Sequence, residues 1–525
     1  MKTLNILTTG AFATLLLLGS CTKDVDNPNS PGGGGEGGVV EGIPTYATVS
    51  LSQRTGAGTY ADAGDYVNGT SQATEAEKKI TDAVVLVFNS DDVLENYVKF
   101  EDAELATAPY AKTFATTTGK KRLYALANLE NYSKIEDIFN GQNGKTAADK
   151  KLSNVCKVIQ RIADISGATT DNEFWMSNVY KLGATIEDQV TVLNVDQTTV
   201  EGGNGDEPTK NNFKVYIGRM TGKVSLTFAA QLAIKSNDGT FDKANAQYRV
   251  RNNPKRFYTF PVYEGTQLIS PYYNRTYDLP NPTDYADANT NVGKNDFFDN
   301  GHDDGGNHTF VPTATDSYLT ENSPKEAKRH KVTFLSIKAK WTPGANALLL
   351  DADGSIADNA AATLKKITDA TDAVPAGNGG TFYRVQKWQG GKIVGYCPGI
   401  YAETPTGWTE VGGTPNNDAG EKTTAVADRN AAKASADACY LIVKYDQGMA
   451  YWAYWMRSRL DGTIAEKYAL KRNNHYKVNI ISVDGVGDPN EDDNLDKDED
   501  LEADASMKAT IEVLNWNVVD IEGGI

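Results

Sequence analysis

The feature that most constrains this chain is a series of short segments in which apolar residues alternate with small or polar ones. Clear examples are TYATVSL (45–51), DAVVLVFN (82–89) and HKVTFLSIKAKW (330–341). A period of two in β-branched and aromatic residues predicts strands, and the Gly, Asn and Asp between them predict turns. A chain of 525 residues is too long for a single core. We therefore predict an all-β protein with two β-sandwich domains and a few short helices.

Individual segments give finer expectations. KKRLYALANL (120–129) predicts a strand with Leu123, Ala125 and Ala127 on one face and Tyr124 and Leu126 on the other. FKVYIGRMTGKVSLTF (213–228) reads as one long strand. Residues 147–165 carry apolar side chains at spacings of three and four, which predicts a helix with its apolar face in the core and Cys156 beside that face.

The N-terminus indicates export. Lys2 precedes a short apolar run, which ends in LLGSC with Cys21 as its last residue. Small residues before a cysteine at this position predict a lipoprotein signal (1–20), with acylation of Cys21, for example by palmitate. An ordinary signal peptide is the alternative. A Gly-rich linker follows Cys21. Of the other cysteines, Cys397 and Cys439 could form a bridge or remain buried thiols.

Charge and motifs exclude several functions. The net charge of −17 disfavours nucleic acid as a partner. No G-x-S-x-G, H-E-x-x-H or C-x-x-C motif occurs, and GQNGKT (141–146) lacks the first glycine of a phosphate loop. Counting Asp and Glu residues does not exclude a glycosidase, but no carboxylate pair stands out. The chain is interpreted as having no enzymatic activity, no cofactor and no metal. Two groups with metal-binding residue types are read as loops, namely His302, Asp303, Asp304 and His308, and Asp492, Asn494 and Asp496.

The C-terminus has two parts. Residues 484–505 are acidic and are predicted to form a solvated, extended arm. Residues 506–525 predict a strand that could reach another molecule. Its apolar residues change phase between Val513 and Leu514, which suggests a bulge; the full set is Met507, Ala509, Ile511, Val513, Leu514, Trp516 and Val518.

An aromatic run, YWAYWMRSR (451–459), has two interpretations. Alternating aromatic residues usually fill a sandwich core and its outer face. They could instead stack on sugars, which would make the chain a surface glycan-binding lipoprotein. The first interpretation is favoured and the second is kept as an alternative.

Several motifs together resemble the fimbrillin family of Bacteroidales lipoprotein pilins (type V pilins). They are YIGRMTGKVSL (216–226), SYLTENS (317–323), YWAYWMRSR and LKRNNHYKVNIISV (470–483). Within the family, the likeness is greatest to the major subunit of the short (minor) fimbriae. The acidic arm departs from the Pro-rich arm typical of that subunit.

The resemblance implies two transthyretin-like β-sandwich domains and a mechanism of assembly. An extracellular Arg-specific protease would cut between Arg54 and Thr55 and remove the strand at 45–53. The C-terminal strand of one subunit would then fill the vacated position in the next, a form of strand addition. The expected division is a signal peptide (1–20), a propeptide (21–54), two sandwich domains (55–210 and 211–483), the arm (484–505) and the donor strand (506–525).

The resemblance also implies where the protein acts. The precursor would be an outer-membrane lipoprotein, and the mature form would lie in cell-surface fimbriae as a shaft subunit. Expected partners are further copies of the chain, anchor and tip fimbrial proteins, the processing protease, and host or bacterial receptors. The implied roles are adhesion, co-aggregation, biofilm formation and virulence. An accessory or tip adhesin is the alternative within the family, although a tip subunit needs no outgoing strand.

Overall fold

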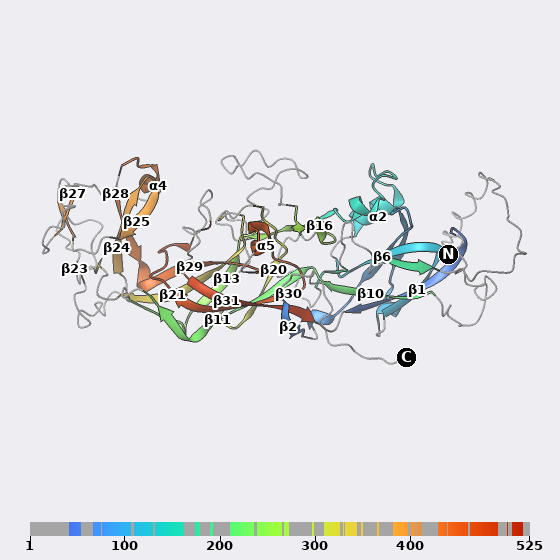
Figure 1. Cartoon of the computed structure of the whole chain (residues 1–525), viewed down its shortest axis with the longest axis horizontal. Coiled ribbons are helices and arrows are strands. Elements are labelled where there is room, and N and C mark those ends of the chain that lie inside the picture. The colour runs from blue at the N-terminus through green and yellow to red at the C-terminus, as the bar shows by residue number, and fades with distance from the viewer. Residues whose placement is uncertain are drawn as a thin grey trace, which may run out of the picture.

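The computed structural model describes the chain in segments separated by gaps. These are residues 41–53, 67–74, 76–106, 110–129, 132–161, 174–178, 189–192, 211–235, 239–264, 267–271, 297–298, 309–325, 329, 331–343, 348–349, 365–366, 382–396, 401–404, 407–410, 429–437, 439–459, 462–491, 501 and 507–517. Figure 1 shows an elongated arrangement of sheets, with the first at one end and the fourth at the other. The predicted all-β class is confirmed.

The first sheet has eight strands. In spatial order they are β4 (Leu94–Lys99), β3 (Ala83–Phe88), β6 (Gly119–Ala127), β8 (Met176–Ser177), β10 (Asn212–Arg219), β1 (Pro44–Gln53) and β5 (Tyr110–Thr117), with β9 (Gln189–Val192) beside β6. The sheet curves until its two ends approach, where Asn96 Nδ2 of β4 donates to Ala115 O of β5 at 2.6 Å.

The middle of the first sheet is covered on both faces. On β3, Ala83, Val85 and Val87 belong to one apolar cluster, while the alternate residues of the same strand belong to another. The same division on β6 separates Leu123 from Tyr124, as the sequence predicted. The unbroken apolar run AVVLVF follows from this burial on two sides. The inner cluster lies between β3 and β6 and the strands β1 and β10; the outer one also contacts α2 (Ser133–Asn140) and α3 (Leu152–Val155).

The second and third sheets enclose a separate core. The second runs β2 (Val67–Gln72), β31 (Met507–Asn517), β30 (Asn474–Val483), β11 (Thr221–Ile234) and β20 (Asp316–Thr320). The third runs β12 (Gly239–Phe241), β21 (Phe334–Pro343), β13 (Gln247–Arg251) and β19 (Val311–Pro312), with β29 (Met449–Trp455) on β21. Leu226 and Val478 of the second sheet meet Ile337 and Trp452 of the third, which makes a β-sandwich.

The remaining elements are smaller. A fourth sheet runs β23 (Lys365–Lys366), β22 (Leu348–Leu349), β24 (Phe382–Gln389) and β25 (Lys392–Tyr396), with β28 (Cys439–Tyr445) on β24. Pairs are β14 (Asn253–Pro254) with β18 (Phe297–Phe298), β15 (Arg256–Tyr258) with β7 (Ile159–Arg161), β16 (Val262–Glu264) with β17 (Gln267–Ile269), and β26 (Tyr401–Thr404) with β27 (Gly407–Glu410). Short helices are η1 (Ala76–Lys78), α1 (Asp102–Leu105), α4 (Arg429–Ala434), η6 (Asp446–Gly448) and α5 (Ile464–Tyr468).

Two predictions about single elements are wrong. The helix predicted over 147–165 is one turn, α3, after which Ile159 enters β7 and pairs with Tyr258. The long strand predicted over 213–228 is two strands, because the chain leaves the first sheet at Arg219 and enters the second at Thr221. Residues after the expected boundary at 210/211 therefore still complete the first sheet, as β10.

The described part of the predicted acidic arm is packed against the rest of the protein. Between residues 484 and 491 the chain lies on the third sheet. The Tyr451 N–H donates to Asp488 O at 2.9 Å, Trp452 Nε1 donates to Gly485 O at 2.9 Å, and the Arg249 guanidinium forms an ion pair with Glu491. Leu501 packs against an apolar cluster that contains Phe334 and Trp455. These described parts of the arm are docked, not solvated and extended.

The structure also bears on whether the cysteines form a disulfide bridge or remain buried thiols. Cys156 is fully buried in the outer cluster of the first sheet, and Cys439 is a buried free thiol. Cys439 is therefore not bridged to Cys397, which itself lies outside the described residues. Within the described segments, no helix is long and apolar enough to cross a membrane.

Candidate functional site

Strand β1 occupies an interior position in the first sheet. It pairs in parallel with β10, from Thr48 opposite Asn212 to Gln53 opposite Ile217. On its other side it pairs antiparallel with β5, from Pro44 opposite Thr117 to Leu51 opposite Tyr110. Loss of β1 would leave two strands with unpaired backbone groups facing one gap.

The side chains of β1 have two faces. Ala47, Val49 and Leu51 are at most 3% exposed and belong to the inner cluster, together with Val215 and Ile217 of β10. Tyr46, on the other face, is 39% exposed. Three buried side chains at a spacing of two provide a strand-shaped apolar position, with roughly 1.5–3 kcal/mol gained for full burial of each larger side chain.

Polar contacts also hold β1. Thr48 N donates to Asn211 O at 2.9 Å, and the amide of Asn211 donates to Tyr46 O at 3.0 Å. The hydroxyls of Thr48 and Thr113 lie 2.8 Å apart. The strand is thus an integrated element of the first sheet and not a loosely attached terminal segment.

The predicted processing sites lie next to β1 but outside the described residues. Arg54 and Thr55 immediately follow Gln53, the last residue of β1, and Cys21 precedes the first described residue. Val518 and the groups around His302 and Asp492 also lie outside. Among the described residues, no cluster of three metal-ligating side chains is present.

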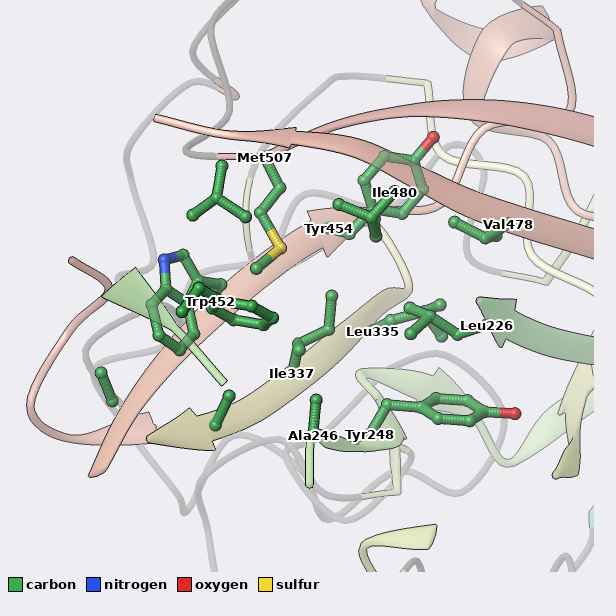
Figure 2. Packing of buried hydrophobic residues seen from close by; sticks show 14 of the residues in the cluster. Leu226, Ala246, Tyr248, Leu335, Ile337, Trp452, Tyr454, Val478, Ile480 and Met507 are labelled. Atoms are coloured by element: carbon green, nitrogen blue, oxygen red, sulfur yellow. The ribbon is translucent and has the colours of Figure 1, made fainter. Parts of the chain in front are cut away.

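The C-terminal strand lies inside its own subunit. β31 pairs antiparallel with β30, from Asn474 opposite Asn515 to Val483 opposite Met507. Met507 is 1% exposed, and Figure 2 shows its side chain directed into the core near Trp452. Ala509 and Ile511 are partly buried against the same core. The backbones at Val513 and Trp516 belong to the strand.

The predicted bulge at Val513–Leu514 is wrong. The pairing with β30 is continuous there, and its irregularity lies between Ile480 and Ser482. Leu514, opposite His475, is nevertheless 5% exposed. Near this end of β30, Asn474, His475 and Tyr476 are all buried, so both faces of the sheet are covered. Double-sided burial, rather than a bulge, explains why the apolar pattern changes phase.

A short strand that the sequence did not predict flanks β31. β2 pairs in parallel with it, with Val67 opposite Val513 and Gln72 opposite Asn517. The sequence of β2, VNGTSQ, has no strand pattern of its own. β2 follows the predicted cleavage site at Arg54 in the sequence and pairs with β31, the predicted donor strand.

Directly after β2, the chain is fixed at the junction between the first and second sheets. Glu77 of η1 lies 3.2 Å from Lys223 Nζ and accepts a hydrogen bond of 3.0 Å from the Tyr318 hydroxyl. Arg219 Nε donates to Glu77 O at 2.9 Å. Burial raises the pKa of the Glu77 carboxyl, but the Thr74 N–H and the Lys223 ammonium together hold it below its usual value.

A second buried ion pair crosses the same junction. Arg472 binds Glu321 through two nitrogens, at 2.9 and 3.2 Å. The same guanidinium donates to Ser177 Oγ of β8 at 3.3 Å and to Tyr258 O at 2.9 Å. It therefore joins the first sheet to the segment that leads into β30.

Three of the motifs noted in the sequence meet at this junction. YIGRMTGKVSL contributes Arg219 and Lys223, SYLTENS contributes Tyr318 and Glu321, and LKRNNHYKVNIISV contributes Arg472. Sequence reasoning did not assign them this role. The signal in the sequence was the presence of charged residues among the alternating apolar residues of predicted strands. A charged side chain that is buried in a sheet needs a partner of opposite charge.

Two family models match the chain at its two ends. "Major fimbrial subunit protein (FimA)" matches residues 47–219, from β1 to the end of β10. "Major fimbrial subunit protein type IV, Fimbrillin, C-terminal" matches residues 443–522, which include β30 and β31. Both models describe fimbrial subunits, and they match the chain near its two ends. The first match ends where the chain leaves the first sheet.

Solved structures give looser likenesses. A fimbrillin (FimA) from Porphyromonas gingivalis is 15% identical, with 90% of this chain and 98% of that chain covered and a TM-score of 0.39. The tip fimbrial protein Mfa3 of the same species is 11% identical, with coverage of 90% and 100% and a TM-score of 0.33. A fimbrial assembly protein from Parabacteroides distasonis is 14% identical, with coverage of 57% and 85% and a TM-score of 0.28. No curated protein matches.

The aromatic run is part of the apolar core. Trp452 is fully buried and Trp455 is 6% exposed, next to Phe334. Neither indole is available to stack on a sugar. The core interpretation of YWAYWMRSR is confirmed, and the glycan-binding alternative loses the residues on which it was based.

Proposed function

We propose that this protein is a fimbrillin, the polymerising shaft subunit of cell-surface fimbriae. The precursor is exported as a lipoprotein acylated at Cys21 and attached to the outer membrane by that lipid. An extracellular Arg-specific protease cuts between Arg54 and Thr55 and releases β1. The C-terminal strand of a second copy, 506–525, then occupies the vacated position.

The observation that carries this proposal is the interior position of β1. A strand at the edge of a sheet could be lost with little effect. Loss of β1 instead breaks two ladders and exposes the inner cluster beside Val49 and Leu51. The resulting gap needs a replacement strand with apolar side chains at a spacing of two. Met507, Ala509 and Ile511 in β31 have that spacing and face one core.

The energetics are consistent with a durable fibre. If about six apolar side chains of the incoming strand become buried, at roughly 1.5–3 kcal/mol each, the gross gain in binding free energy is on the order of 10–20 kcal/mol. Ordering of the arm and loss of subunit freedom offset part of this gain. A head-to-tail contact that does not close on itself produces a filament. Anchor and tip fimbrial proteins would end it, and surface receptors would bind along it or at its tip.

The test is the substitution Arg54→Ala in the full-length precursor, expressed in a fimbriated host. We expect the mature N-terminus at Thr55 to disappear and polymer ladders on denaturing gels to be lost. The control is Arg122→Ala, which removes an arginine of β6 that pairs with Asp92. Its ladder should persist. Polymers of normal length from Arg54→Ala would overturn the proposal.

A further inference from the structure

Strand β2 makes β31 an interior strand of the second sheet. β31 has β30 on one side and β2 on the other, with Thr70 opposite Asn515 and Ser71 opposite Trp516. Without β2, β31 would be the edge strand and would be held by one ladder only. Because each backbone hydrogen bond must be broken to free a strand, the second ladder raises the barrier to release of β31.

The two ends of β2 are held differently. Its C-terminal end is followed by η1, where Glu77 is fixed by Lys223 and Tyr318. Lys223 and Tyr318 belong to β11 and β20 of the same sheet, so these polar contacts are not made with β1 itself. The N-terminal end is joined through residues 54–66 to β1, which is paired in the first sheet. In the uncut chain, β2 is thus covalently joined to a paired or ion-paired element at each of its ends.

We infer that β2 is a latch on β31, and that cleavage after Arg54 loosens it. This inference rests on the cleavage in the proposed function. The cut separates β2 from β1 and leaves the latch attached only through η1. One cut therefore acts at both ends of the subunit, because it vacates the position of β1 and also lowers the cost of releasing β31.

The latch is built to be weak. It has six residues, lies at a sheet edge and contains Gly69 in an irregular step between Val67 and Thr70. Glycine inside a strand and parallel pairing both reduce ladder stability. β31 forms a longer ladder with β30, from Asn474 to Val483. Once the N-terminal end of β2 is free, the ladder between β2 and β31 should therefore open before the ladder between β30 and β31.

The first test uses hydrogen exchange in the uncleaved full-length chain. The double variant Thr70→Pro with Ser71→Pro removes two adjacent N–H groups, at least one of which faces β31 whichever way the strand alternates. Amides of residues 507–517 should exchange about tenfold faster than in the wild type. Peptides of β21 and β29 should be unchanged. The control, Ala61→Pro with Ala63→Pro, makes the same change before β2 and should leave 507–517 unaffected.

Unchanged exchange at 507–517 in the Thr70→Pro, Ser71→Pro variant would overturn the inference. A second measurement does not depend on that variant folding. Wild-type chain is cut at Arg54, checked by intact mass, and compared at low concentration with uncut chain and with Arg54→Ala exposed to the same protease. Exchange at 507–517 should rise only in the cut chain, and equal rates in all three would overturn the latch.

The outcomes separate the latch from the proposed function. Faster exchange at 507–517 after the cut, without polymers, supports the latch and contradicts strand exchange. Polymers formed without any change in that exchange support strand exchange and contradict the latch.

Discussion

Lys223 Nζ lies 3.2 Å from Glu77 Oε1, and the two side chains are 6% and 3% exposed. The pair joins the first short helix after β2 to the long strand β11. Since Asp316 lies 2.6 Å from the same ammonium, Lys223 has a second carboxylate beside it. The chain downstream of the proposed cut is consequently fixed to the second sheet by buried charge and not by apolar contact alone.

Replacement of Glu77 by Gln should destabilise the protein. The amide keeps the shape but removes the charge that compensates Lys223, and we expect a loss of about 1–3 kcal/mol. The measurement is urea unfolding of the precursor at neutral pH. As a matched control, Glu104→Gln removes a partly exposed partner of Lys112 and should cost much less than Glu77→Gln. Equal effects of the two variants would contradict the role of the junction pair.

His475 should make stability depend on pH. Burial lowers the pKa of His475 to about 4. The nearby Asp316 carboxylate acts to raise this pKa, whereas Lys223 and Lys477 lower it further. The unfolded chain, with the usual histidine pKa near 6.5, binds the proton first, so stability should fall as the pH drops from about 6.5 to about 4. Unfolding midpoints measured across this range should show a shallower fall for His475→Gln. A slope identical to that of the wild type would refute the assignment to His475.

Leu51→Ala should affect the precursor but not the fibre. The side chain is 3% exposed in the inner cluster, so its truncation should cost the uncut chain about 2–4 kcal/mol. According to the proposed function, β1 is absent from the fibre, so the resistance of assembled polymer to heating in detergent should be unchanged. Ser50→Ala, on the other face of β1, is the control and should cost under about 1 kcal/mol. Weakened fibres from Leu51→Ala would show that β1 remains in them.

Ile511→Asp should abolish polymerisation while the monomer stays folded. The side chain is only partly buried in its own subunit, where the charge can be tolerated, but it would enter an apolar gap in the next. Thr510→Asp places the same charge on the exposed neighbouring position and should still assemble. Electron micrographs and circular dichroism of the two variants test this. Equal loss of fibres in both would indicate a general effect of charge on the strand.

The alternation of apolar residues was sufficient to predict which side chains of a single strand lie on the same face of the sheet. β6 could be predicted residue by residue, since alternation alone assigns Leu123 and Tyr124 to different clusters. The spacing of apolar residues gave a wrong prediction for Ile159. It indicated a helix, but Ile159 pairs in a strand with Tyr258, a residue far along the chain. The step between sheets at Met220 was not predicted, since the strands on both sides have the same alternation. The polar β2 forms because β31 offers it a partner.

The mixed pairing around β1 bears on the polarity of the fibre. Its neighbours β10 and β5 run in opposite directions, one parallel and the other antiparallel to β1. A strand entering the gap in either direction would therefore form one parallel and one antiparallel ladder, so the backbone does not favour either orientation. Side chains must decide the direction of insertion, and the spacing of two allows registers to change only in steps of two residues. In the proposed strand exchange, the orientation of the incoming strand is thus decided by side-chain fit in the inner cluster.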